Sequence, residues 1–260
     1  MTMKLPALFL SHGAPTLAVE ETNETRAWAA LAKELPSPRE ILAVSAHWDT
    51  ATPEVSAAAR PETIHDFNGF PRALYEQRYD APGAPDLAEA AAKLLAHAGI
   101  GCAVDPGRGL DHGAWVPLKW MYPKADIPVT QLSVQSRRGA RHHYELGKAL
   151  APLRDDGVLV LCSGGIVHNL REIQWQSNEP VAWAREFNDW MVDRVAAKDI
   201  ETLLDYRQKA PSAVRSHPTD EHLEPFFVAL GCGGFPSRRL ELGMTMGSLG
   251  MDGFVFGKAD

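Results

Sequence analysis

The sequence has few cysteines and no long apolar run. Cys102, Cys162 and Cys232 are odd in number and widely spaced along the 260 residues. Because they form no CxxC pair, they indicate neither a disulfide framework nor a zinc knuckle, and we expect buried thiols. No apolar stretch approaches the roughly 20 residues that a helix needs to cross a bilayer. We therefore expect no membrane partner.

The sequence also lacks a basic region. Lysine and arginine number 26 against 33 acidic residues, which gives a formal net charge of −7. With no basic patch and no aromatic-plus-basic motif, nucleic acid is not an expected partner. The opening stretch "MTMKLPALFLSHG" has no long apolar region followed by a small-residue cleavage site, so it does not look like a signal peptide. It is typical of a first β-strand, and we expect a cytoplasmic protein.

What the sequence does contain is a succession of short apolar runs that alternate with helical patterns. The runs show no polar alternation, which is typical of strands buried on both faces. The alternation predicts a single α/β domain over residues 1–260, with a mostly parallel central sheet flanked by helices on both faces. The expected strands are Ala7–Leu10, Ile41–Ser45, Gly101–Val104, Val129–Ser133 and Val158–Cys162, and the expected helices are Thr25–Glu34, Pro85–His97, Arg141–Leu153 and Pro180–Ala197.

Three of these strands lead to a histidine within a few residues. His12 follows the first strand, His47 follows the second, and His168 comes after the fifth and its "SGG" turn. The carboxyl ends of parallel strands share one edge of a sheet, where ligands bind. Imidazole is the commonest protein ligand for transition metals. A metal site at this edge is therefore expected.

A further candidate ligand is His222, in "SHPTDEHLEP". If Thr219 is an N-cap, His222 falls near the start of a helix, where the positive helix end favours the neutral, ligating imidazole. Glu221 and Glu224 are rival oxygen ligands, hydrogen-bond partners of a ligand, or simply first-turn acids.

The other histidines lie in loops or on helices. His112 in "GLDHGAW" and His65 in "TIHDFNGFP" could each hold a polar substrate group or bond a loop carbonyl. The remaining histidines, which we expect at the surface or in caps, are His97, His142, His143 and His217. No HExxH, GxSxG, P-loop or GxGxxG pattern is found. The residues alone thus predict an α/β enzyme with a histidine-rich mononuclear metal site.

A set of motifs in order along the chain resembles the DOPA 4,5-dioxygenase family of class III extradiol ring-cleaving dioxygenases. They are "LFLSHGAP", "VSAHW", "TIHDFNGFP", "DHGAWVPL", "MYPKADIPVTQLS", "SGGIVHNLR", "EHLEPFFVALG" and "MGSLGM", and the resemblance runs from about residue 6 to 251. The resemblance implies a non-haem Fe(II) centre that uses O₂ to open a catechol to a semialdehyde. It places His12, His47 and His222 on the metal positions, His168 on the catalytic histidine and His112 on a second active-site histidine.

The third metal position does not decide which metal is bound. The wider superfamily often has a glutamate as the third ligand. This chain has His222 at the matching position, and the DOPA branch also has a histidine there. Three histidines make a neutral site, whereas two histidines and a carboxylate carry a negative charge. Fe(II) is expected for activity, but Zn²⁺ could occupy the purified protein, with His168 as a fourth ligand.

Two other functions remain open on the residues. A zinc hydrolase of a small amide or ester would use the same histidines to hold Zn²⁺ and an activated water. A non-catalytic binding protein would use a metal closed off by four protein ligands as a structural brace. The sequence selects neither the catechol nor the oligomeric state, for which we expect a monomer or a small homo-oligomer. The residues that could pair with a substrate carboxylate are Arg60, Arg72, Arg108 and Arg171.

Overall fold

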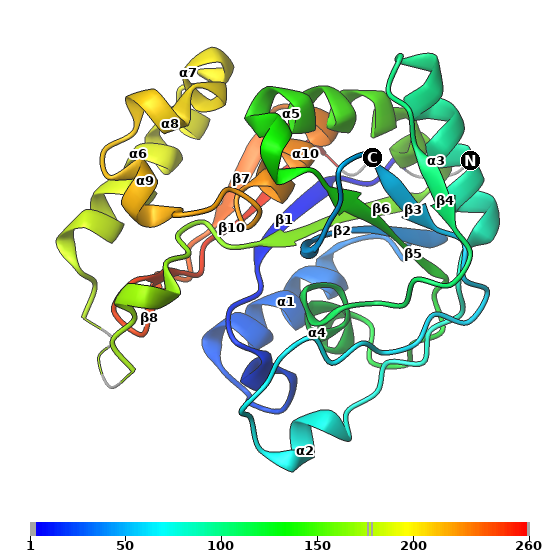
Figure 1. The fold of residues 1–260 in the computed structure, drawn as a ribbon, viewed down its shortest axis with the longest axis horizontal. Helices are drawn as coiled ribbons and strands as arrows, with labels where there is room; N and C mark the ends of the chain where they lie inside the picture. The colour runs from blue at the N-terminus through cyan, green and yellow to red at the C-terminus, as the bar shows by residue number, and fades with distance from the viewer. Residues whose placement is uncertain (1–3, 176, 178, 259–260) are drawn as a thin grey trace.

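The computed structural model describes residues 4–175, 177 and 179–258. Its main feature is an 8-stranded sheet with the strand order β4-β3-β5-β2-β6-β1-β10-β7 (Figure 1). The four strands at its centre run parallel to one another. They are β5 (Val129–Val134), β2 (Glu40–Asp49), β6 (Val158–Gly164) and β1 (Ala7–Ser11). The expected mostly parallel sheet is confirmed.

The outer strands make the sheet mixed. Beyond β5, β3 (Glu54–Ser56) runs antiparallel to it and β4 (Ala103–Asp105) pairs with β3. Beyond β1, β10 (Gly253–Phe256) runs antiparallel to β1, and β7 (Ser237–Leu240) runs antiparallel to β10. The C-terminal segment also forms a short pair, β8 (Met244–Thr245) with β9 (Leu249–Gly250).

One expected strand forms but is less buried than predicted. The stretch Gly101–Val104 was expected to be buried on both faces, but β4 lies at the edge of the sheet and Val104 is 44% exposed. An apolar run of this length does not reveal whether a neighbouring strand will cover it.

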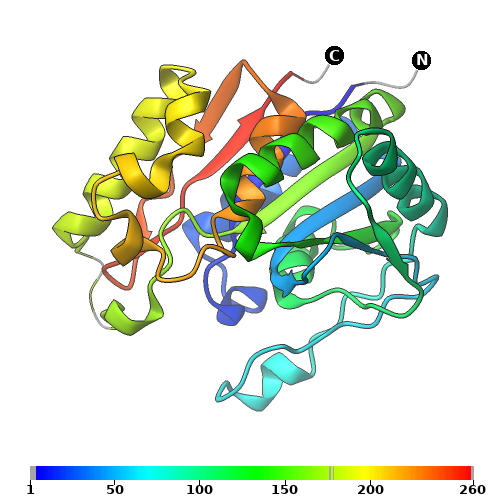
Figure 2. The ribbon, with the colours of Figure 1, turned by 45° about the horizontal axis from the view of Figure 1, so that its top comes forward.

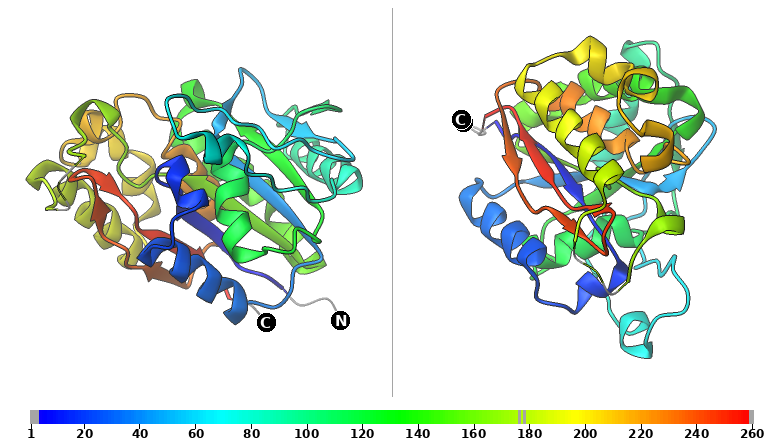
Figure 3. Two further views of the ribbon diagram at one scale, coloured as in Figure 1. Left: turned by 90° about the horizontal axis from the view of Figure 1, so that it is seen from below. Right: turned by 90° about the vertical axis from the view of Figure 1, so that its left-hand side faces the viewer.

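Helices cover both faces of the sheet, as expected, because successive side chains of its strands point to opposite sides. Phe9 and Leu42 face one core, whereas Leu8 and Ile41 face the other. Figure 2 shows helices over the first face, and the left view of Figure 3 shows those over the second. The first group is α3 (Pro85–His97), α5 (Gly139–Leu150), α6 (Ala182–Ala196) and α10 (Glu224–Gly233), and the second is α1 (Asn23–Glu34) and α4 (His112–Met121).

Short helices fill the connections. α7, α8 and α9 follow α6 and pack beside it, at the end of the molecule where β7 lies (Figure 1). The short helices are η1 (Pro15–Ala18), α2 (Arg72–Tyr75), η2 (Ser136–Arg138), η3 (Ala151–Asp156), η4 (Leu170–Glu172), α7 (Ile200–Leu204), α8 (Tyr206–Lys209) and α9 (Ala213–Ser216). In the described part of the chain, no helix is both long and apolar enough to cross a membrane.

Several helix boundaries differ from those expected. α4 begins at His112, inside a stretch expected to be a loop, because the Asp111 side chain caps it by accepting a hydrogen bond from the Ala114 amide at 3.2 Å. Thr219 does not cap a helix. α10 begins only at Glu224, so His222 lies in the turn before it.

Two histidines expected near the surface are fully buried. His143 Nδ1 lies 2.6 Å from a carboxylate oxygen of Glu224, in the core between α5 and α10. His217 pairs through Nε2 with the carbonyl oxygen of Ile166 at 3.0 Å. Glu224 therefore faces His143 in the interior and is not a rival ligand beside His222.

Candidate active site

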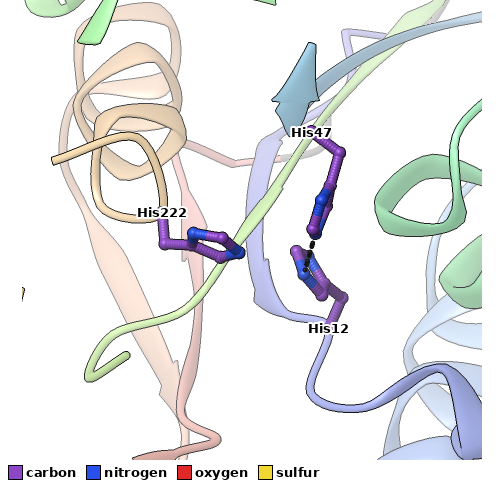
Figure 4. A group of neighbouring side chains, drawn as sticks. All are labelled: His12, His47 and His222. Carbon is purple, nitrogen blue, oxygen red and sulfur yellow. Dashed lines mark hydrogen bonds between the residues drawn. The ribbon is translucent and has the colours of Figure 1, made fainter. Parts of the chain in front are cut away.

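Three histidines meet at the carboxyl ends of the central strands. His12 follows β1 and His47 lies near the end of β2, and their Nε2 atoms are 3.0 Å apart. His222 approaches from the turn before α10, with its ring centroid 5.5 Å from that of His12 and 5.0 Å from that of His47. One ring nitrogen from each lies within 4.8 Å of the others, and Figure 4 shows the three rings pointing toward one another.

The strand ends explain why these side chains converge. β2 pairs regularly with β5 up to Val44, and the register then shifts before Asp49. Such an irregularity re-aims the side chains that follow it, here His47. At the end of β1, Gly13 has φ 63, in the left-handed region that favours glycine, and the chain turns away directly after His12.

The "SGG" segment, Ser163–Gly165 at the end of β6, holds the backbone of His222. The Gly165 amide donates a hydrogen bond to the His222 carbonyl oxygen at 2.8 Å. A β-carbon at Gly164 would collide with that same carbonyl oxygen. The glycine at this position therefore allows the two segments to touch through their backbones.

Each of the three rings is fixed at Nδ1 by a different side chain. His12 Nδ1 lies 2.9 Å from Ser163 Oγ, His47 Nδ1 lies 3.3 Å from Asp66, and His222 Nδ1 lies 3.0 Å from Glu221. A carboxylate can only accept a hydrogen bond, so the neutral His47 and His222 rings carry their proton on Nδ1 and leave a lone pair on Nε2.

The arrangement of the Nε2 atoms fits a divalent transition metal. His222 Nε2 is buried and has no hydrogen-bond partner, which is costly unless a ligand satisfies it. His12 and His47 present their Nε2 atoms to each other at 3.0 Å, a spacing at which two such nitrogens share a proton or face a common cation. Three imidazole nitrogens are donors that Fe and Zn both accept.

Burial keeps these imidazoles neutral. Desolvation is the main cause that lowers the pKa of His12 and of His222 well below its usual value, and neighbouring imidazoles lower it further. Burial and the nearby His112 likewise lower the pKa of His47 to about 4. The neutral form of His222 thus comes from burial and not from the end of a helix.

Asp66 is a site residue that the sequence analysis did not single out. One of its carboxylate oxygens accepts hydrogen bonds from the backbone amide and Nδ1 of His112, both at 3.0 Å, while the other faces His47 Nδ1 at 3.3 Å. Burial acts to raise the pKa of Asp66, but the hydrogen bonds and charge of His112 outweigh it and hold the pKa at about 2. The "HD" pair in its Gly/Pro-rich loop was the available signal.

His112 and His168 lie on either side of the three-histidine group. The His112 ring packs 3.9 Å from that of His47, and the His168 ring stacks on that of His222 at 3.4 Å with an interplanar angle of 7°. Burial lowers the pKa of His168 to about 3. A ring nitrogen of His168 lies within 4.8 Å of a ring nitrogen of His222 and a carboxylate oxygen of Glu221. His168 is not part of the group formed by His12, His47 and His222.

The histidines form the inner end of a cavity of about 310 Å³. His65 is not among its lining residues, and its Nε2 lies 2.9 Å from the Gln77 carbonyl oxygen. None of Arg60, Arg72, Arg108 and Arg171 lines the cavity either. The outer wall is apolar and includes Phe67, Phe70, Leu170, Ile173, Trp175 and Leu249.

Comparisons with known proteins agree with this arrangement. Residues 6–245 match the family model described as the catalytic LigB subunit of aromatic ring-opening dioxygenase. The chain is 43% identical over 234 residues to 4,5-DOPA dioxygenase extradiol of Beta vulgaris, covering 88% of this chain and 87% of the relative. It is 42% identical over 255 residues to 4,5-DOPA dioxygenase extradiol of Escherichia coli K12, covering 95% and 93%.

A solved structure gives the same result for the fold. An uncharacterised protein from Escherichia coli K12 superposes with a TM-score of 0.82 at 36% identity, covering 98% of this chain and 100% of that one. These comparisons lend no support to the zinc hydrolase that the sequence left open. The chain therefore belongs to the LigB family of aromatic ring-opening dioxygenases and is an extradiol ring-cleaving dioxygenase.

Proposed function

We propose that the protein opens a catechol ring beside its two hydroxyls, with O₂ as co-substrate and Fe(II) held by His12, His47 and His222. The observation that carries this proposal is the convergence of three imidazoles, one of them with a buried unpaired Nε2, at the inner end of a cavity. Fe(II) bound there would lower the pKa of a coordinated hydroxyl and supply the redox chemistry that O₂ requires, whereas Zn²⁺ would supply only the first. The same donors accept Zn²⁺, so purified protein could contain it.

His168 is our candidate for proton transfer. It lines the cavity, stacks on His222 and is neutral at pH 7 because burial lowers its pKa to about 3. A neutral imidazole can take a proton from a substrate hydroxyl whose pKa a bound metal would lower, and it can later return that proton. Its stacking on a metal-binding ring also leaves open a role as fourth ligand when Zn²⁺ is bound.

His112 is our candidate for orienting the substrate. Asp66 engages its Nδ1, and the ring lines the cavity beside His47. Nε2 is therefore the atom left to hydrogen-bond a polar group of the substrate. His65 was a second candidate, but because it pairs with Gln77 and lies outside the cavity, we assign it packing against the Phe67 ring at 5.7 Å.

We further propose that the 260 residues act as one catalytic domain, as a monomer or small homo-oligomer, in the cytoplasm. The continuous 8-stranded sheet supports one domain. Cys162 and Cys232 are buried free thiols, which suits a reducing compartment.

The test is reconstitution of the protein without oxygen, using ferrous iron in one sample and zinc in another. Oxygen uptake and absorbance are then recorded over a panel of catechols. We expect the iron protein alone to consume O₂ and to form a yellow semialdehyde. A protein that holds iron at the three histidines but consumes no O₂ with any catechol would contradict the proposal.

A further inference from the structure

We infer that Met246 contacts the ring substituent of the catechol, its arm, and is a specificity-determining residue that favours armed catechols over catechol itself. The contact is with the carbon chain of the arm, so it does not depend on whether the arm ends in a charged group. This inference rests on the proposed catechol chemistry and deepens it. Two features carry it, the strained backbone of Met246 and its place in the wall of the active-site cavity.

Met246 stands at the tip of the hairpin that β8 and β9 form, within the "MGSLGM" stretch. Its φ is 51, in the left-handed region. There the β-carbon is crowded, a cost that glycine avoids and that asparagine and aspartate tolerate best. Gly247, the next residue, has φ 72 and is the residue type that such a turn favours. A methionine held in this conformation points to a role for its side chain.

A neighbouring segment holds the tip of the hairpin in place. The Gln174 amide donates a hydrogen bond to the Met246 carbonyl oxygen at 2.8 Å, and the Val181 amide donates one to the Gly247 carbonyl oxygen at 2.9 Å. A β-carbon at Gly247 would lie 3.2 Å from Gln174 Cβ, so the turn and this segment are in close contact. These contacts fix a backbone conformation that is unfavourable for methionine.

The base of the hairpin is anchored by Asp252, which is fully buried. One of its carboxylate oxygens accepts hydrogen bonds from the Leu242 amide at 2.8 Å and the Gly243 amide at 3.0 Å. Its carbonyl oxygen accepts a hydrogen bond at 2.8 Å from the hydroxyl of Ser11, which directly precedes His12. The hairpin is thereby joined to the strand end that carries a proposed metal ligand, and the position of Met246 relative to the histidines is fixed.

Met246 is half-buried and lines the cavity whose inner end is formed by the histidines. Leu249 of the same hairpin and Trp175 line this cavity too. A catechol whose two hydroxyls face the histidines directs its arm toward the outer wall. An unbranched thioether adapts its shape to such a partner. Burial of about two methylenes against it is worth roughly tenfold in affinity.

The experiment compares armed and armless substrates on the wild type and on Met246→Gly, both loaded with ferrous iron. Oxygen uptake gives kcat/KM for catechol, for 4-propylcatechol and for 3,4-dihydroxyphenylpropionate. In Met246→Gly we expect the ratio of each armed compound to catechol to fall by about tenfold, through a higher KM. Met246→Leu restores an apolar side chain and should recover most of this ratio.

Stability separates this role from a purely structural one. Glycine relieves the left-handed backbone, so Met246→Gly should unfold in urea at a midpoint no lower than that of the wild type. Lys198→Gly is the matched control, because Lys198 has φ 57, is exposed and lies outside the cavity. It relieves the same backbone conformation and should leave the substrate ratio unchanged.

The outcomes distinguish this inference from the function on which it rests. An unchanged substrate ratio in Met246→Gly would overturn the inference, and so would a lower midpoint with equal losses for all three compounds. In either case catechol cleavage by the wild type would still stand. A wild-type protein that turns over none of the three compounds would overturn the proposed function and the inference with it.

Discussion

A side chain at Nδ1 orients each of the three proposed metal-binding imidazoles. Ser163, Asp66 and Glu221 hold the three rings in orientation. Partners of this kind fix the tautomer of a ligating histidine and its direction. Together with burial, they leave neutral Nε2 atoms that face one point.

Removing either strand-end histidine should remove the metal. We expect His12→Ala and His47→Ala to purify without stoichiometric metal and without activity, because each deletes one of three donors. The measurement is metal content by mass spectrometry. His97→Ala, at the C-terminal end of α3, is the control and should keep its metal. Unchanged stoichiometry in the first two variants would exclude them as ligands.

Replacing His168 should separate proton transfer from metal binding. A positioned acid–base group typically contributes about 10²–10⁴-fold to a rate. His168→Ala should therefore slow oxygen uptake by that range while metal content stays at the wild-type level. Loss of the metal along with the activity would show that His168 is a ligand.

Asp66 should matter although it is neither a ligand in our proposal nor the acid–base group. Asp66→Asn keeps the shape but removes the anion that accepts hydrogen bonds from His112 and faces His47 Nδ1. We expect a loss of about 10–100-fold in metal affinity or kcat. Asp80→Asn, at an exposed carboxylate paired with Arg78, is the matched control. Equal behaviour of the two variants would remove Asp66 from the site.

At the scale of elements, α4 has to pack directly against the ends of β1 and β2. A β-carbon at Gly113 would collide with the Ser45 hydroxyl and lie 3.1 Å from His47 Cδ2 and 3.2 Å from His12 Nδ1. A glycine in the first turn of α4 therefore sets how closely the helix approaches the metal-binding histidines.

Gly113→Ala should push the start of α4 away from the two rings. We expect a cost of about 1–3 kcal/mol in unfolding free energy, together with weaker metal binding. Urea unfolding and metal titration measure the two effects. Gly101→Ala, where a β-carbon meets nothing within 4 Å, serves as the control. A Gly113→Ala protein with wild-type metal affinity would show that α4 can shift without disturbing the site.

The sequence could predict the elements that have a strong local signal. Apolar runs marked the central strands, and the "SGG" turn marked a close backbone approach, seen between Gly165 and His222. It could not predict α4, which contains Gly113 and Pro117, two poor helix formers, or the burial of His217, which depends on a carbonyl 51 residues away in the chain. Asp66 was missed for the same reason, because its partners His47 and His112 lie far from it in sequence.

At the scale of the whole molecule, buried histidines make stability depend on pH. Burial lowers the pKa of His217 and of His47 to about 4 and that of His168 to about 3, while an unfolded histidine titrates near 6.5. Between these values the unfolded chain binds more protons than the folded one. Stability therefore rises with pH across this window and is lost as the pH falls through it.

We expect the metal-free protein to lose stability between pH 7 and pH 5. A fully buried group such as His217 should contribute about 2 kcal/mol to this loss, and the other buried histidines add to it. The raised pKa of the buried Glu224, caused by desolvation, acts in the opposite direction. Urea unfolding at the two pH values measures the difference. Equal stability at both would contradict the neutral, buried state of these rings.

The most direct test of the central claim is anomalous X-ray diffraction at the iron edge, from crystals of protein loaded with ferrous iron in the absence of oxygen. We predict one peak in the cavity, bound by Nε2 of His12, His47 and His222 together. Iron bound elsewhere, or at fewer than these three imidazoles, would contradict the proposed metal centre.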